Sequence, residues 1–256
     1  MKFSLLSYGI PKKWPLEKLI GEATRLGYSG IELRCEWEQG HGVELELSAQ
    51  QRRDVRYRVQ DAYLEIAGLG CSSRFHYTDT KIRSENVDRA KRYIDLAADV
   101  GALALRVCGN EFPANVERRE CIRYVAESLG EIADHAAPAG INVLLEMHGE
   151  FNNWHFCLGA MKHAGRTNLG LLLNSDDRDL VDGSIASTFS RIRPHLKHVH
   201  LHDLTSGYPY DELFALLAAS GYDGYISPEI SNAEPSPEDY LALYTTHIKT
   251  LRKAGA

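Results

Sequence analysis

The stretch LGYSGIEL, at residues 26–33, has a glycine directly after a helical pattern and a second glycine directly before a short apolar run. Near the other end of the chain, SGYDGYISPEI at residues 220–230 repeats this arrangement. A glycine that follows the last helical residue is a common helix stop, and short β-rich runs bounded by turn residues predict strands. The same helix–loop–strand arrangement therefore occurs near both ends of the chain.

Short apolar or β-rich runs recur along the whole chain, and segments with helical spacing separate them. In the first such segment the spacing is carried by Leu16, Leu19, Ile20 and Ala23. Eight alternating units without a linker predict an α/β fold, a (β/α)₈ TIM barrel that forms a single domain over residues 1–256. The alternative is an open doubly wound sheet, but no GxGxxG or GxxxxGK[ST] motif opens a helix. The predicted strands are residues 2–8, 29–34, 63–69, 102–108, 141–148, 168–173, 197–202 and 224–230.

Residues that begin and end helices support these boundaries. Pro15 and Pro237 lie where first-turn prolines are expected, and Ser84 and Ser236 can act as N-caps. The predicted helix ends are marked by four glycines, Gly27, Gly101, Gly140 and Gly221.

Composition excludes several classes of protein. The formal net charge is −6, with Lys and Arg scattered along the chain, so no basic stripe favours a nucleic acid as the main partner. No run is apolar enough to cross a bilayer, and the apolar stretch near the N-terminus is too short for a secretory signal. The five cysteines are widely spaced and lack a CxxC motif, which is typical of reduced thiols. We expect a soluble, cytoplasmic protein.

The stretch KHVHLHD, at residues 197–203, places three histidines at alternating positions, so that they share one face of a strand. We expect His198, the deepest of the three, to be a core histidine. In a (β/α)₈ barrel the C-terminal ends of the strands form the mouth that carries the functional groups. The last four predicted strands end in polar residues: Glu146 and His148 on the fifth, Asn174 on the sixth, His200 and His202 on the seventh, and Glu229 on the eighth.

Two glutamates inside a barrel need a partner. A buried carboxylate costs several kcal/mol unless it is paired or bound to a metal. A divalent cation would satisfy Glu146 and Glu229 together, and oxygen-rich ligands with one imidazole suit Mn²⁺, Mg²⁺ or Co²⁺ and also permit Zn²⁺. The structural alternative is that the glutamates pair with Arg34 or Arg106 inside the barrel.

The motifs GYSGIEL, LLEMHGE, LGLLLNSDD, HVHLHDL and GYISPEI follow one another through the whole chain. With them the sequence resembles the xylose isomerase-like barrel superfamily, and more closely its sugar (phosphate) isomerase/epimerase branch. The resemblance implies a divalent metal held by four strand-end residues, Glu146, Asn174, His200 and Glu229. Asn174 is a departure, because the family has Asp there. An Asn carbonyl can still coordinate, but it removes one negative charge, and Asp176 or Asp177 could substitute.

The resemblance also implies roles in catalysis. Glu146 and Glu229 would be the acid/base pair that moves a proton through an enediolate, one on each face of the bound sugar. His148 and His202 would contact substrate hydroxyls or carry protons. Further candidate substrate contacts are Glu32, His76, Arg106 as a clamp for a carboxylate or phosphate, and Trp154 as a sugar-stacking wall or a helix-packing residue.

We therefore expect a metal-dependent isomerase or epimerase that acts on a small sugar or a related polyol or keto acid. One alternative is a dehydratase of the same family. Another is a non-catalytic or metal-free sugar-binding barrel whose metal site has decayed at Asn174. An apurinic-site endonuclease with this barrel would need more metal ligands on the first four strands than the sequence offers. Association into a homo-oligomer stays open.

Overall fold

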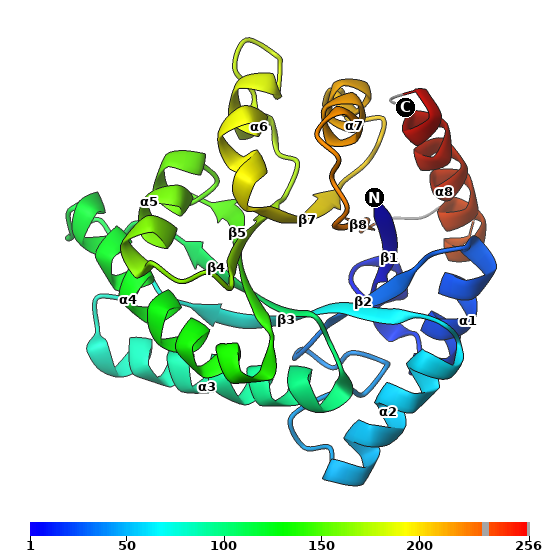
Figure 1. Cartoon of the computed structure of the whole chain (residues 1–256), viewed down its shortest axis with the longest axis horizontal. Helices are drawn as coiled ribbons and strands as arrows, with labels where there is room; N and C mark the ends of the chain where they lie inside the picture. Colours follow the sequence, from blue (N-terminus) through cyan, green and yellow to red (C-terminus); the bar gives the residue numbers. More distant parts are fainter. Residues whose placement is uncertain (232–235, 255–256) are drawn as a thin grey trace.

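The computed structural model describes residues 1–231 and 236–254, and eight parallel strands there close into one barrel (Figure 1). Each strand pairs with the next in sequence, and β1 closes the ring by pairing with β8. The strands are β1 (Lys2–Leu6), β2 (Gly30–Arg34), β3 (Glu65–Arg74), β4 (Ala104–Asn110), β5 (Asn142–Gly149), β6 (Leu169–Leu173), β7 (Leu196–Leu201) and β8 (Tyr225–Pro228).

The helices surround this ring of strands, with a helix after every strand (Figure 1). The predicted (β/α)₈ TIM barrel, as a single domain, is confirmed. The α-helices are α1 (Leu16–Leu26), α2 (Ala49–Asp61), α3 (Thr80–Val100), α4 (Arg118–Ala136), α5 (Trp154–Ala164), α6 (Ala186–Ile192), α7 (Tyr210–Ala219) and α8 (Pro237–Ala254). Short 3-10 helices are η1 (Ile10–Lys13), η2 (Ala137–Ala139), η3 (Asp177–Asp179) and η4 (Arg193–His195).

Side chains alternate between two separate apolar clusters. On β5, Val143 and Leu145 belong to the large core between the strands and the helices. Leu144, between them, belongs to a small cluster with Ala104 and Leu172. Because successive strand residues point to opposite faces, Glu146 continues the face of Leu144 into the barrel. The small inner cluster is the floor, and charged residues lie above it toward the C-terminal ends of the strands.

The helix N-termini correct one prediction. Ser84 lies inside α3, which begins one turn earlier at Thr80. The N-cap of α3 is Asp79, whose side chain accepts hydrogen bonds from two backbone amides of the first turn. Ser236 does cap α8, because its hydroxyl oxygen accepts the backbone N–H of Asp239 at 3.1 Å. Asp and Ser are both good N-cap residues, and in α3 the residue at the N-cap position is Asp79 rather than Ser84.

Prolines and glycines lie close to their predicted places. Pro237 is the first residue of α8, whereas Pro15 is the N-cap of α1 rather than a residue of its first turn. Gly27 and Gly101 end α1 and α3 in the left-handed conformation, with φ of 71° and 77°. This conformation favours glycine because it has no Cβ.

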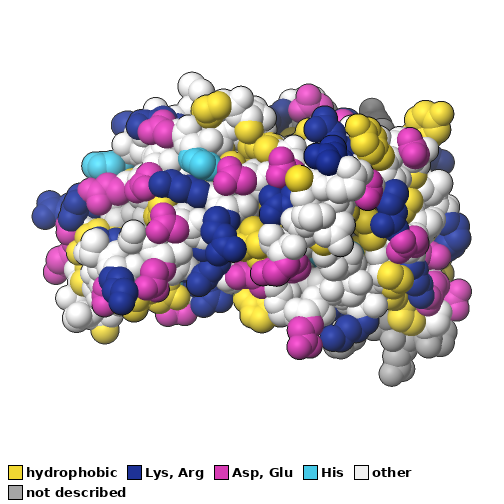
Figure 2. All heavy atoms as spheres, turned by 90° about the horizontal axis from the view of Figure 1, so that it is seen from below, with side chains coloured by type: hydrophobic (Ala, Val, Ile, Leu, Met, Phe, Trp, Pro, Cys, Tyr) yellow, Lys and Arg dark blue, Asp and Glu magenta, His cyan; other side chains and the backbone are white. Residues whose placement is uncertain are grey.

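The surface agrees with the charge distribution in the sequence. On the face in Figure 2, acidic and basic side chains are interspersed rather than gathered in one stripe. Within residues 1–231 and 236–254, no helix combines the length and the apolar character needed to cross a membrane. All five cysteines are buried and free.

Candidate functional site

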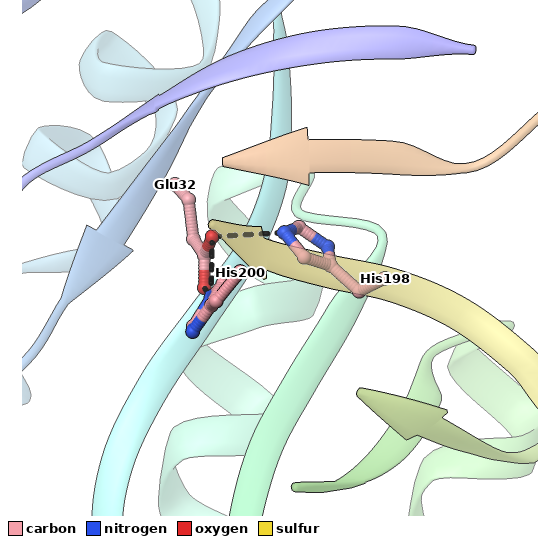
Figure 3. Close-up of side chains that lie close together, drawn as sticks. All are labelled: Glu32, His198 and His200. Carbon is pink, nitrogen blue, oxygen red and sulfur yellow. Dashed lines mark hydrogen bonds and ion pairs between the residues drawn. The ribbon is translucent and has the colours of Figure 1, made fainter. Parts of the chain in front are cut away.

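A buried carboxylate and two imidazoles meet inside the barrel (Figure 3). Glu32 extends from β2 toward β7, where its carboxylate lies 3.0 Å from Nε2 of His200 and 2.9 Å from Nε2 of His198. Nε2 of His198 also lies 2.9 Å from the hydroxyl oxygen of Ser227 on β8. All three members of the cluster are at most 2 % exposed. His198 is thus the hydrogen-bonded core histidine that its position on the strand predicts.

The opposite nitrogen of His200 faces two further carboxylates. Nδ1 of His200 lies 3.0 Å from an oxygen of Glu229 and 3.4 Å from Oε1 of Glu146. These two glutamates come from the ends of β8 and β5, on either side of the histidine strand. The structure therefore brings Glu146, His200 and Glu229 together, with their ligand atoms within 4.8 Å of one another.

Glu146 uses its second oxygen for different partners. Arg106 of β4 places Nη2 2.8 Å from Oε2 of Glu146, and the thiol of Cys108 donates to the same oxygen at 3.2 Å. Arg106 also donates to the backbone carbonyl of Cys71 and is 5 % exposed. The sequence left open whether Arg106 pairs with a glutamate or clamps the substrate, and the structure shows the ion pair.

Two buried oxygens at this site have no hydrogen-bond partner among the described residues. One is Oε1 of Glu146, which forms no hydrogen bond but lies 3.4 Å from Nδ1 of His200, and the other is Oδ1 of Asn174, at the end of the neighbouring strand β6. A buried oxygen without a hydrogen bond is costly, so such atoms are candidate ligands of a cation or a water. A divalent metal that binds carboxylate, carbonyl and imidazole donors fits this set.

Asp176 and Asp177, the two substitutes considered for Asn174, belong to the neighbourhood of η3. Asp176 is the N-cap of η3, and its oxygens accept hydrogen bonds from the guanidinium of Arg178 at 2.8 Å. This ion pair lowers the pKa of Asp176 and also occupies its carboxylate. Asp177 is exposed, whereas Asn174 has a buried side-chain oxygen without a hydrogen bond among the described residues.

Proton affinities in the cluster follow from its alternating charges. Burial alone would raise the pKa of Glu32, but the charges and hydrogen bonds of His200 and His198 outweigh it and hold that pKa well below its usual value. Burial likewise opposes protonation of His200, yet the three surrounding carboxylates raise its pKa well above the ordinary value. The pKa values of Glu146 and Glu229 are lowered, against burial, mainly by Arg106 and His200 respectively. The surrounding carboxylates therefore favour the protonated form of His200.

The predicted contacts His148 and His202 lie at the rim of this cluster, and both are half-buried. Nδ1 of His148 lies 2.9 Å from the side-chain oxygen of Asn110. A ligand atom of His148 lies within 4.8 Å of those of Glu146 and Cys108. His202 follows β7, and its Nδ1 lies 3.3 Å from the backbone carbonyl of Glu229.

His76 and Trp154 make their contacts outside the cluster around His200. His76 is buried after β3, with Nδ1 3.0 Å from the backbone carbonyl of Gly109. Trp154 begins α5, where its ring stacks on that of His155 at 3.3 Å between centroids and lies below the guanidinium of Arg191 from α6. These contacts join Trp154 to helices rather than to the glutamates.

Sequence reasoning did not assign a role to Cys108, although a signal was available. Cys108 follows Arg106 by two residues on β4, so it shares the inward face at one level nearer the mouth. Its thiol is fully buried beside Glu146, and burial raises its pKa to about 12. The thiol is therefore a neutral donor to the carboxylate.

Known proteins resemble this chain over most of its length. The fructoselysine 3-epimerase of Shigella flexneri is 23 % identical over an alignment of 256 positions, gaps included, which covers 90 % of this chain and 90 % of the other. A solved structure of an L-ribulose 3-epimerase superposes with a TM-score of 0.84 at 15 % identity, covering 99 % of this chain and 95 % of the other. The IolI protein, solved with a bound zinc atom, gives a TM-score of 0.81 at 17 % identity and covers 100 % of this chain and 99 % of the other.

These similarities accompany a match to one protein family. The family described as xylose isomerase-like TIM barrel matches residues 20–253. That range contains β2 to β8, and with them every residue of the cluster around His200. The chain belongs to the xylose isomerase-like TIM barrel family.

Proposed function

We propose that the protein is a metal-dependent isomerase or epimerase of a small sugar or a related polyol or keto acid. The observation that carries this proposal is the convergence of Glu146, His200 and Glu229 inside the barrel, with ligand atoms within 4.8 Å of one another. Oδ1 of Asn174, at the end of the neighbouring strand β6, is buried without a hydrogen bond among the described residues and is the proposed fourth donor. The similarity to a fructoselysine 3-epimerase and to the fold of an L-ribulose 3-epimerase supports the reaction class.

Four residues would hold the metal: Glu146, Asn174, His200 and Glu229. Glu32 would hold the other ring nitrogen of His200, so that Nδ1 is the nitrogen left for the cation. The IolI protein, which has a similar fold, was solved with a bound zinc atom, and this supports a divalent ion as the cofactor. We propose Mn²⁺, Mg²⁺ or Co²⁺, with Zn²⁺ as an alternative, because the donor set is rich in oxygen.

The two glutamates would carry the proton transfer. A bound divalent metal polarises the carbonyl and hydroxyl oxygens of a sugar and so acidifies the adjacent C–H bond. One carboxylate then removes that proton and the other protonates the carbon from the opposite face. The Glu229 side chain is 12 % exposed and that of Glu146 1 % exposed, so Glu229 is the more accessible base. Arg106 and Cys108 would keep Glu146 ionised and fixed in position.

The experiment is a metal determination followed by an exchange assay. The protein is purified without chelators, stripped, reloaded with Mn²⁺ and compared with Glu146→Gln and with Glu127→Gln, a matched change of an exposed glutamate on α4. We expect about one metal per chain in the wild type and in Glu127→Gln, and a large loss in Glu146→Gln. The loaded protein is then incubated with ketoses and keto acids in D₂O to detect deuterium at carbon.

The outcomes separate the alternatives. No metal under either condition would favour the non-catalytic or metal-free sugar-binding barrel. Metal binding with a product lighter by one water would identify a dehydratase of the same family. Metal binding and deuterium incorporation, both lost in Glu146→Gln, would establish the proposed reaction class.

We further propose that the protein works in the cytoplasm on a small-molecule substrate, without a nucleic acid or membrane partner. The five free, buried cysteines support a reducing compartment. Whether two copies associate is open to a sedimentation measurement.

A further inference from the structure

Arg34 is a second arginine on the inner face of the barrel, at the C-terminal end of β2. It ends β2, two residues beyond Glu32, so its side chain continues the same inward face toward the mouth. Gly70 of β3 makes room for it, because a Cβ at Gly70 would lie only 3.0 Å from Cδ of Arg34. The positive charge of Arg34 contributes to lowering the pKa values of Glu146 and His148, which places it in their neighbourhood.

The guanidinium of Arg34 has no hydrogen-bond or ion-pair partner among the residues that the structure describes. Its Nε is buried and unpartnered. The backbone, by contrast, is fixed, because Arg34 N–H donates to Ser7 at 2.8 Å and Nε2 of His41 lies 2.8 Å from the Arg34 carbonyl. Arg106, the other arginine of the lumen, already binds Glu146. A fixed backbone with an unpaired cation indicates that the missing partner is not part of the protein.

Two aromatic rings hold this cation in place. The guanidinium carbon of Arg34 lies 5.4 Å from the ring centroid of Tyr8 and 5.8 Å from that of Trp37. Arginine that stacks on rings keeps its N–H donors free in the guanidinium plane, where a carboxylate or phosphate can accept two of them. The rings of Tyr8 and Trp37 therefore lie beside the guanidinium without accepting hydrogen bonds from its N–H groups.

The turn that carries Trp37 is strained. Glu36, Trp37 and Glu38 all have positive φ, at 70°, 52° and 54°, a conformation that costs each non-glycine residue about 1–2 kcal/mol. Glu36 anchors the turn by accepting hydrogen bonds from the amide and the hydroxyl of Ser72 at 2.5 and 2.8 Å. Strain that the surroundings enforce is often found at ligand-binding positions.

We propose that Arg34 binds an anionic group of the substrate, a carboxylate or a phosphate ester, so that the protein acts on a sugar acid or a sugar phosphate rather than on a neutral sugar. This inference rests on the proposed function and narrows its substrate class. Arg34 takes the role of substrate clamp that the sequence suggested for Arg106.

The test measures binding rather than turnover. Titration calorimetry compares erythronate, erythritol 4-phosphate and neutral erythritol, which share a carbon chain and differ in charge. We expect the wild type to bind at least one of the two anions about tenfold or more tightly than erythritol, the scale of a charge-assisted hydrogen-bond pair. Preference for erythronate would identify the carboxylate, and preference for the phosphate would identify the ester.

Two variants make the result specific. Arg34→Gln should lose the preference for the anion, whereas Arg123→Gln, the same charge change on the exposed face of α4, should keep it. If Arg34→Gln melts well below the wild type, Arg34→Lys replaces it and should show a preference several-fold weaker than the wild type, because lysine lacks the planar fork. The inference is overturned if the wild type has no preference for either anion, or if the preference survives undiminished in the Arg34 variant.

Each titration is run with Mn²⁺ and again with EDTA. A carboxylate that binds only through a metal would lose its advantage in EDTA and would be insensitive to Arg34, which contradicts the inference. An Arg34-dependent preference in a protein that binds no metal would uphold the inference and contradict the proposed metal chemistry.

Discussion

Glu32 and His200 are 168 residues apart in the chain, and their side chains meet at 3.0 Å in the interior of the barrel. Since Nε2 of His200 faces Glu32, Nδ1 is directed to Glu146 and Glu229. A carboxylate on the far side of a metal-binding histidine fixes the tautomer and the orientation of the ring and raises its basicity. If His200 binds a metal as proposed, Glu32 would be a positioning residue, whereas the sequence suggested a substrate contact.

Glu32→Gln should weaken metal binding while leaving the metal-facing residues in place. The amide keeps the shape of the side chain but removes the negative charge behind His200, and changes of this kind typically reduce metal affinity about 10- to 100-fold. Competition with a metal-binding dye measures the dissociation constant for Mn²⁺. Glu127→Gln is the matched control, and equal affinities in the two variants would contradict the positioning role.

Asn174→Asp should strengthen metal binding. The substitution puts a carboxylate where a buried amide oxygen lies without a hydrogen bond, and it adds a negative charge to the proposed metal site. The same charge should make the metal-free protein less stable, because it puts a carboxylate at a buried position where the amide oxygen has no hydrogen-bond partner among the described residues. Melting temperatures with and without Mn²⁺ should therefore diverge more than in the wild type. Gln60→Glu on the exposed face of α2 adds an equal charge and should not widen this gap.

Arg106→Met should destabilise the fold. It removes the cation 2.8 Å from Oε2 of Glu146 and leaves a carboxylate that is fully buried. Breaking a buried ion pair on one side typically costs about 3–5 kcal/mol. Urea unfolding of metal-free protein measures the free energy of unfolding, and Arg123→Met tests the same change on the surface. A loss below about 1 kcal/mol would show that Arg106 is not needed to stabilise the charge of Glu146.

His41 should make the protein sensitive to acid. It is buried beneath the turn that carries Trp37, and its Nδ1 accepts the backbone N–H of Val43 at 3.0 Å. Burial lowers its pKa to about 4. An unfolded histidine titrates at about pH 6.5, whereas folded His41 stays neutral down to about pH 4. Between these two pH values the unfolded state takes up a proton that the folded state does not, so the free energy of unfolding falls by about 3 kcal/mol as the pH is lowered from about 6.5 through about 4.

The pH dependence can be tested by substituting two histidines, one buried and one exposed. Unfolding free energies measured between pH 7 and pH 4 should decline less steeply in His41→Asn than in the wild type. His247→Asn, a change of an exposed histidine on α8, should follow the wild-type curve. Parallel curves for His41→Asn and the wild type would assign the acid sensitivity to other groups.

The fold and the inward residues could be predicted because barrel geometry converts sequence spacing into position. Alternation on β5 distinguishes Leu145, which packs against helices, from Leu144 and Glu146. Parallel strands end on the same side, so Glu146 and Glu229 could be expected at one mouth although 83 positions separate them in the numbering. Ser84 was misplaced because residue type alone does not decide which of two good caps begins a helix.

Contacts across the lumen could not be predicted in the same way. Whether Glu32 reaches His200 depends on strand tilt and on the irregular pairing of β2 with β3, where the register shifts at Glu32. The ion pair between Arg106 and Glu146 likewise depends on the level at which β4 meets β5. The contact between Arg34 and the ring of Trp37 requires a turn with three consecutive positive φ angles, at residues 36–38. The residue types in this turn, Glu, Trp and Glu, do not predict that conformation.

Closure of the barrel between β1 and β8 has a consequence for folding during translation. The backbone amide of Lys2 donates to Gly224, so the first strand has no partner on one edge until the last strand has been synthesised. Glu229 arrives with that same strand, and until then Glu32 and His200 stay in an open sheet. Nascent chains that still lack residues 224–230 should therefore expose a sheet edge and depend on chaperones. The proposed metal-binding cluster should assemble only near the end of translation.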